Sequence, residues 1–358
     1  MVFMNPVSDA QQKLLPEMTE LLKKRYSILS AVQLEGPIGR RALSEMVRLT
    51  ERDVRKETDI LRNQNLLIIQ NGGMAISQEG ISVLERLKET MRQWSGLSDM
   101  ESALETVLGI SRVVIVPQDS DEIAAVQTQI GREAARYLES RFTEFKRIAV
   151  TGGSTMAAVA DELKTEKPDS QLEFIAARGG LGEDVLHQAN TIASAFAKKT
   201  GASCRTLYLP DHLSAEAYEM MMREPFIREM NTLYDKAEII VHGIGDAQEM
   251  AARRRSTPEE LKVILDGGAV GESFGYYFNE SGEVVYRIRT VGIQLEQLKK
   301  VPVILAVAGG KTKAKAILSY MKHAPKQTIL FTDEGAAEAM LKKYNLTGGN
   351  RHDFKISD

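Results

Sequence analysis

The first part of the chain carries apolar residues at helical spacing. Leucines, a methionine and a tyrosine recur every three or four positions in residues 14–29, which predicts an amphipathic helix that Gly36-Pro37 ends. A second short helix is expected from Ile38 to Val47. Thr50 suits an N-cap and acidic residues follow it, so a third helix is expected to start there. The pattern predicts three helices in close succession.

Two short apolar runs, residues 66–70 and 74–77, then predict a β-hairpin. Asn71-Gly72 lies between them and favours a type I′ turn, in which both central residues have positive φ. Three helices and a hairpin are typical of a winged helix-turn-helix domain, here expected in residues 1–78, whose third helix enters the major groove of DNA. The residues expected to contact DNA lie in the second and third helices: Arg40, Arg41, Thr50, Arg52, Arg55 and Lys56. A small oligomerisation domain with solvated arginines is the alternative interpretation.

Residues 79–97 predict a helical linker with one apolar stripe. Its members are Ile81, Leu84, Leu87, Met91 and Trp94. Such a stripe packs either against a core or against a second copy of the chain, and the pattern does not separate the two. A protein that reads two half-sites needs a symmetric assembly, so a homo-oligomer between dimer and tetramer is expected.

From residue 98 to residue 345, short apolar runs alternate with helical segments, and glycine loops follow several of the runs. One such loop is Thr151-Gly152-Gly153-Ser154-Thr155, and others contain Gly179-Gly180 and Gly309-Gly310. The alternation predicts an α/β domain with a mostly parallel sheet, in which ligands bind outside the carboxyl ends of the strands. Glycines and helix N-termini at that edge suit a phosphorylated small molecule. Residues 346–358 are expected to form a polar tail.

Charge and cysteine content limit the classes of function. The net charge of −3 means that any attraction to double-stranded operator DNA must be local. The single cysteine, Cys204, allows neither an internal disulfide nor a thiolate zinc site, so no metal is expected, and it is consistent with the cytoplasm. No apolar run reaches the length of about 18 residues that a membrane span needs, so no membrane partner is expected.

Familiar nucleotide motifs fail on inspection. A Walker loop would need a glycine six residues before Lys311, where Leu305 stands. Gly243-Ile244-Gly245 would need a third glycine three residues later to bind a dinucleotide, and Gln248 stands there. Neither ATP nor NAD is therefore favoured, and no cofactor is expected.

Several strings resemble the SorC family of bacterial sugar-responsive transcriptional regulators. The residues that carry the resemblance are Gly36-Pro37-Ile38-Gly39-Arg40-Arg41, Val150-Thr151-Gly152-Gly153, Ala177-Arg178-Gly179-Gly180-Leu181-Gly182-Glu183-Asp184, Val241-His242-Gly243-Ile244-Gly245, Phe274-Gly275-Tyr276-Tyr277-Phe278-Asn279 and Thr332-Asp333-Glu334-Gly335-Ala336-Ala337. The resemblance implies an effector domain similar to glucosamine-6-phosphate deaminase and ribose-5-phosphate isomerase. It also implies a repressor of a glycolytic operon that contains glyceraldehyde-3-phosphate dehydrogenase. Fructose 1,6-bisphosphate would relieve the repression.

The resemblance also implies the effector site. One phosphate is expected at the loop after residue 150, with Lys313 near it, and Arg253 is expected near the second phosphate. The full expected set is Thr151, Gly152, Gly153, Ser154, Thr155, Arg178, Gly180, Leu181, Gln188, Arg253, Glu272 and Lys313. Lys311-Thr312 replaces small polar residues beside Lys313, which leaves open which lysine holds the phosphate.

Two other functions compete with this interpretation. The first is a sugar-phosphate isomerase or deaminase, with Glu272 or Asp333 as a base and Lys313 polarising a carbonyl oxygen. Carboxylates near a sugar also simply accept hydrogen bonds from hydroxyls, and this is the favoured interpretation, so no enzyme is expected. The second is a transcriptional activator of sugar catabolism, because the residues do not set the sign of regulation.

Overall fold

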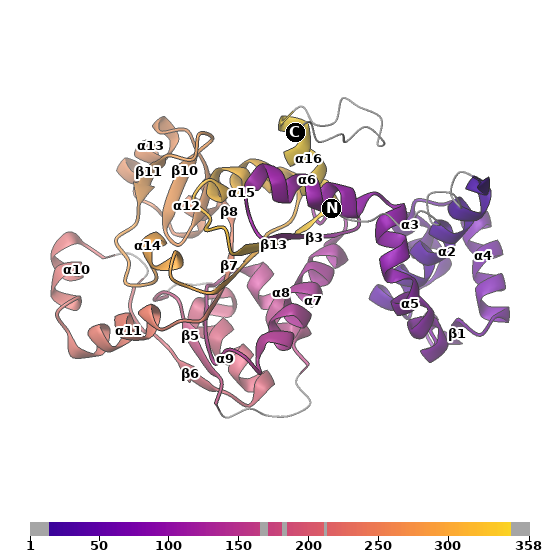
Figure 1. The fold of residues 1–358 in the computed structure, drawn as a ribbon, viewed down its shortest axis with the longest axis horizontal. Helices are drawn as coiled ribbons and strands as arrows, with labels where there is room; N and C mark the ends of the chain where they lie inside the picture. The colour runs from indigo at the N-terminus through magenta and orange to yellow at the C-terminus, as the bar shows by residue number, and fades with distance from the viewer. Residues whose placement is uncertain (1–13, 165–170, 181–184, 211–212, 345–358) are drawn as a thin grey trace. The chain divides into compact units, whose positions relative to one another are not determined.

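The structure is a computed structural model that describes residues 14–164, 171–180, 185–210 and 213–344 (Figure 1). The chain divides into two compact units, residues 1–99 and residues 100–358. Among the described helices, none combines the length and the apolar character that crossing a membrane requires.

The first unit contains the three helices and the hairpin that the apolar pattern predicts. Its buried residues form one core that includes Ile28, Leu43, Val54 and Leu67. The elements are α2 (Pro16–Glu35), α3 (Arg40–Val47), α4 (Glu51–Asn63), the antiparallel strands β1 (Leu67–Gln70) and β2 (Gly73–Ile76), and α5 (Gln78–Trp94).

Local signals in this unit are partly confirmed. The Thr50 hydroxyl accepts a hydrogen bond from the Asp53 amide at 3.1 Å, which confirms the predicted N-cap of α4. The predicted type I′ turn is wrong, because Gly72 has a φ of 103° while Asn71 is not among the described residues with positive φ. The next residue, Gly73, has no room for a side chain, since β2 lies against the backbone of Ile38.

The second unit is built on a seven-stranded sheet in which all neighbouring strands are parallel, in the order β3-β13-β12-β7-β4-β5-β6. The mostly parallel α/β fold is therefore confirmed. The central strands are buried on both faces, as a sheet covered by helices requires. The strands are β3 (Arg112–Val116), β4 (Arg147–Val150), β5 (Glu173–Ala176), β6 (Ser203–Arg205), β7 (Ile239–Gly243), β12 (Val303–Val307) and β13 (Thr328–Asp333).

Helices cover both faces of this sheet (Figure 1). The order of the strands reverses direction along the chain, and right-handed crossovers then place the helices of the two halves on opposite faces. One face carries α7 (Ala124–Arg141), α8 (Ser154–Glu162) and α9 (Ala189–Thr200), and the other carries α6 (Leu97–Leu108), α15 (Ala314–Met321) and α16 (Glu334–Lys343).

A small antiparallel sheet is inserted between β7 and β12, with strand order β11-β10-β9-β8. Its strands are β8 (Gly245–Asp246), β9 (Ala269–Ser273), β10 (Tyr276–Asn279) and β11 (Val284–Arg287), and it packs with α12 (Ala247–Arg253) and α13 (Pro258–Asp266). The remaining elements of this unit are η1 (Val185–His187), α10 (Ala215–Met221), α11 (Pro225–Asp235), α14 (Leu295–Leu298) and η2 (Lys311–Lys313).

One histidine of β7 is buried where the two sheets meet. His242 is 0% exposed, and its Nδ1 lies 3.1 Å from the Ser273 hydroxyl while its Nε2 lies 3.1 Å from the Tyr320 hydroxyl. Burial lowers the pKa of His242 to about 4, because the imidazolium would lose its hydration. The ring is therefore neutral in the folded protein at neutral pH.

This burial predicts a stability that falls in mild acid. An unfolded histidine has a pKa of about 6.5, so between that value and about pH 4 the unfolded chain binds a proton that the folded chain does not. The contribution is complete above the unfolded pKa and is lost as the pH falls, by roughly 1 kcal/mol per pH unit. The midpoint temperature of unfolding, measured at a series of pH values from 7 to 4, should fall less steeply with decreasing pH for His242→Gln than for the wild type.

Tyr320→Phe is the matched control, because it removes the hydrogen bond to Nε2 but keeps the buried histidine. Its midpoints should keep the wild-type dependence on pH. If the unfolding midpoint depended equally steeply on pH in the wild type and in His242→Gln, the pKa of His242 would not be lowered by burial.

Candidate functional site

A cavity of about 740 Å³ lies where the loops that follow β4, β5 and β7 meet the small sheet. Eleven of the twelve residues predicted to bind an effector line it, and Leu181 lies outside the described residues. The predicted residues that the structure brings together are Thr151, Gly152, Gly153, Ser154, Thr155, Arg178, Gly180, Gln188, Arg253, Glu272 and Lys313.

The loop after β4 presents a helix N-terminus to the cavity. Gly153 has a φ of 124°, its amide donates to the His187 carbonyl at 2.8 Å, and α8 starts at Ser154. Within the described residues, no side chain caps this end of α8. The first amides of the helix can therefore bind an anion, and the positive end of the helix dipole favours one.

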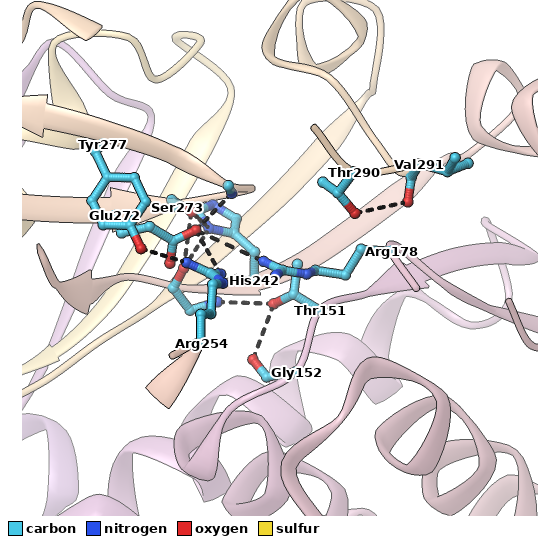
Figure 2. A network of polar contacts seen from close by, with 12 residues as sticks. Thr151, Gly152, Arg178, His242, Arg254, Glu272, Ser273, Tyr277, Thr290 and Val291 are labelled. Carbon is cyan, nitrogen blue, oxygen red and sulfur yellow. Dashed lines mark hydrogen bonds and ion pairs between the residues drawn. The ribbon is translucent and has the colours of Figure 1, made fainter. Parts of the chain in front are cut away.

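A buried carboxylate organises another part of the cavity lining, and Figure 2 shows its polar contacts. Glu272 on β9 is only 4% exposed. Its Oε1 lies 3.0 Å from an amino nitrogen of Arg254 and 3.8 Å from one of Arg178. Two guanidinium groups therefore lie close to one buried carboxylate. A buried carboxylate needs such partners, because an unpaired buried charge is costly.

The same carboxylate also holds a strained turn. Ser273 and Tyr276 pair across β9 and β10, and the two residues between them, Phe274 and Gly275, have φ values of 55° and 84°. The Gly275 amide donates to Glu272 Oε1 at 2.6 Å. Positive φ at a phenylalanine is uncommon, and such positions occur often at functional sites.

The packing of the Phe274 ring explains why the turn tolerates a positive φ at this residue. The ring lines the cavity and also packs on His242 at a centroid distance of 4.6 Å. The sequence favours a turn with two positive φ values at Asn71-Gly72, but the structure has such a turn at Phe274-Gly275 instead. Tertiary packing, rather than the local preference of the residues, therefore sets the conformation of this turn.

Arg254 is the main residue of the site that sequence analysis missed. It lines the cavity, with 9% of its side chain exposed, and it also donates to the Tyr277 hydroxyl at 3.1 Å. Spacing could have identified it, because Ala247 and Ala251 are buried and Arg254 continues their stripe by a further three positions. Arg253, the predicted residue, is exposed at the rim of the same cavity.

The structure places the residues of two predicted alternatives differently with respect to the cavity. Lys313 is half-buried and lines the cavity, whereas Lys311 is exposed and does not. Asp333, considered as a base, does not line the cavity: it is buried and accepts hydrogen bonds from the amides of Ser120, Gly310 and Ala336 and from the Ser120 hydroxyl. Its role is structural, because its acceptor sites are already used by four donors.

The basic residues predicted to contact DNA lie on the first unit. Arg40 and Arg41 are exposed at the start of α3. Arg52, Arg55 and Lys56 are exposed on α4, opposite its buried face of Val54, Thr58 and Leu61. Thr50 caps α4, so its hydroxyl is engaged within the helix start.

Comparison with known proteins finds a matching family for each of the two units. Residues 92–342 match the family described as "Putative sugar-binding domain", and residues 21–91 match "CggR N-terminal DNA binding domain". The central glycolytic genes regulator of Priestia megaterium is 44% identical over 96% of this chain and 100% of its own length. The Bacillus subtilis protein of the same name is 43% identical over 95% of this chain and 99% of its own length.

Solved structures of transcriptional regulators are also similar to this chain. The structure of an Enterococcus faecalis regulator assigned to the SorC family is 44% identical, covers 68% of this chain and 99% of its own, and superposes with a TM-score of 0.63. Full-length SorC from Klebsiella pneumoniae, 16% identical, shares the fold over 84% of this chain and 93% of its own with a TM-score of 0.63. This chain therefore belongs to the SorC family of transcriptional regulators, which join a DNA-binding domain to a sugar-binding domain.

Proposed function

We propose that this protein represses an operon of glycolytic genes, including the gene for glyceraldehyde-3-phosphate dehydrogenase, and that fructose 1,6-bisphosphate in the cavity relieves the repression. The observation that carries the proposal is the cavity itself, which combines a helix N-terminus with cationic side chains. The names of two relatives, each spanned almost entirely by this chain, support the glycolytic target.

The two phosphates of fructose 1,6-bisphosphate suit two different parts of the cavity lining. The first amides of α8, with the hydroxyls of Ser154 and Thr155 and the ammonium of Lys313, suit one phosphate. Arg178 and Arg253 offer planar donor groups that suit a second phosphate. Glu272 and Gln188 then remain for sugar hydroxyls. The effector domain is proposed to share the architecture of phosphosugar isomerases and deaminases.

Binding rather than catalysis fits the carboxylates of this site. A general base must be able to take a proton from the substrate. Glu272 is instead held by Arg254 and by the Gly275 amide, which both donate to its Oε1. Asp333 is engaged away from the cavity.

The first unit is proposed to be a winged helix-turn-helix domain within residues 1–78, with α4 in the major groove and the β1–β2 hairpin as its wing. Arg52, Arg55 and Lys56 would meet DNA from α4, while Arg40 and Arg41 would hold the phosphate backbone. Two such domains would engage two half-sites, so the assembly is proposed to be a dimer or a tetramer.

The coupling between effector and operator is proposed to run through the spacing of the DNA-binding domains. An effector shifts an equilibrium only if it binds two states unequally, and a coupling of about 1–3 kcal/mol would change operator affinity about 5–150-fold. The linker helix is a candidate route. Its Leu84 belongs to the core of the first unit, so at that position the stripe packs within the chain rather than against a second copy.

Arg178→Ala should keep operator binding but lose the effector response. Arg178 lies 3.8 Å from Glu272, and the closer partner Arg254 stays in place, so the domain should remain folded. Loss of a charge-assisted contact to phosphate should raise the fructose 1,6-bisphosphate concentration needed for release by at least about tenfold. Fluorescence anisotropy of a labelled operator fragment, titrated with the bisphosphate, measures both properties.

Arg205→Ala is the matched control for that experiment, because Arg205 lies on β6 outside the cavity lining and pairs with Glu173. It should respond to the bisphosphate like the wild type. Release of the Arg178→Ala variant at wild-type concentrations would refute the assignment of this site.

Arg40→Ala should weaken operator binding without affecting the effector site. A phosphate contact displaces about one counterion, so the slope of log affinity against log salt should become shallower by about one. Arg112→Ala removes the same charge from the second unit and should leave the slope unchanged. An unchanged slope in Arg40→Ala would remove Arg40 from the DNA interface.

A further inference from the structure

Three successive backbone amides next to Lys313 each donate to a carboxylate from another segment. The Gly310 amide donates to Asp333 at 2.7 Å, the Lys311 amide to Asp119 at 3.3 Å, and the Thr312 amide to Asp121 at 2.8 Å. These amides belong to the turn that leads from β12 through η2 into α15. Amides at such a position are the groups that would otherwise be open to an anion.

The order of the strands brings the three acids together. β13 lies between β3 and β12, so the segments that follow β3 and β12 meet over the end of β13. Asp333 ends β13 and ties the two segments to each other, since it accepts from the Ser120 amide at 3.0 Å as well as from Gly310. The arrangement is therefore a property of the parallel sheet rather than of one loop.

Close packing fixes this arrangement. A side-chain carbon added at Gly310 would collide with the Asp121 carboxylate, and one added at Gly335 would collide with Asp119. Gly310 also has a φ of 99°, a conformation that a residue with a side chain rarely adopts. The Lys313 amide then donates to the Gly310 carbonyl at 3.0 Å, so fixing Gly310 fixes the start of Lys313.

We propose that Asp119 and Asp121 are positioning residues for Lys313: they hold the turn of residues 310–312 from outside the cavity and thereby direct the lysine into it. The inference rests on the proposed function of that cavity as a sugar-phosphate site. It also assigns different roles to the two glycine loops. The start of α8 is open to a phosphate, whereas the start of η2 is occupied by the chain's own carboxylates and contributes the ammonium of Lys313.

Whether a single substitution weakens or tightens ligand binding distinguishes positioning from simple repulsion. Carboxylates near an anion site would oppose the ligand if their charge were what mattered, and removing them would tighten binding. If they hold the turn instead, removing the acceptor should weaken binding. Asp121→Asn separates the two effects, because its amide oxygen can still accept from Thr312 while the charge is gone.

The experiment titrates the full-length chain with fructose 1,6-bisphosphate in a calorimeter. Asp121→Ala should weaken binding about tenfold, and Asp121→Asn should stay within about threefold of the wild type. In a Lys313→Ala background, Asp121→Ala should add less than about twofold, because a double-mutant cycle exposes the dependence of one residue on the other. If Asp121→Ala does not fold, Asp119→Ala tests the same turn, with a smaller loss expected because its hydrogen bond is longer.

Two results would overturn the inference. One is tighter binding in both Asp121 variants, which would show repulsion. The other is the same loss from Asp121→Ala with and without Lys313, which would show a general structural effect. Failure of the proposed function has a different signature, because the wild type itself would then not bind the bisphosphate.

Discussion

The loops after β4, β5 and β7 meet at the cavity because of one constraint: the seven strands of the large sheet run in the same direction, so their carboxyl ends share one edge. Residues far apart in the sequence, such as Thr151 and Lys313, therefore line one cavity. The small antiparallel sheet, inserted after β7, closes that edge with its own polar residues. Helix starts and glycines at this edge then give a cavity rich in donors, as such sheets commonly do.

The buried carboxylate of Glu272 links the cavity to the packing beneath it. Glu272 is held by Arg254 and the Gly275 amide, so one carboxylate fixes both a guanidinium and a strained turn. The turn places Phe274 between the cavity and His242. A ligand that drew Arg178 away from Glu272 would therefore act on a group that also supports the packing beneath the site. Such a link between site and core is the kind of element that a two-state regulator needs.

Much of this organisation could be predicted from the sequence, because it follows from local pattern. Apolar spacing predicts the helices of the first unit, and the alternation of apolar runs with glycine loops predicts the parallel sheet and its ligand edge. Contacts that depend on strand order could not be predicted, since order is not a local property. Asp119 and Asp121 reach the loop of β12 only because β13 lies between β3 and β12. The turn at Phe274 was missed because its positive φ is imposed by packing.

We propose that occupancy of the cavity and binding of operator DNA oppose each other. Linkage requires the opposition to be reciprocal: if the bisphosphate weakens operator affinity by some factor, the operator must weaken bisphosphate affinity by the same factor. The most direct test is therefore to measure the affinity of the full-length protein for fructose 1,6-bisphosphate with and without saturating operator DNA. We expect the bisphosphate to bind more weakly when operator is present, by the same factor by which the bisphosphate weakens operator affinity. An affinity that operator DNA leaves unchanged would contradict it.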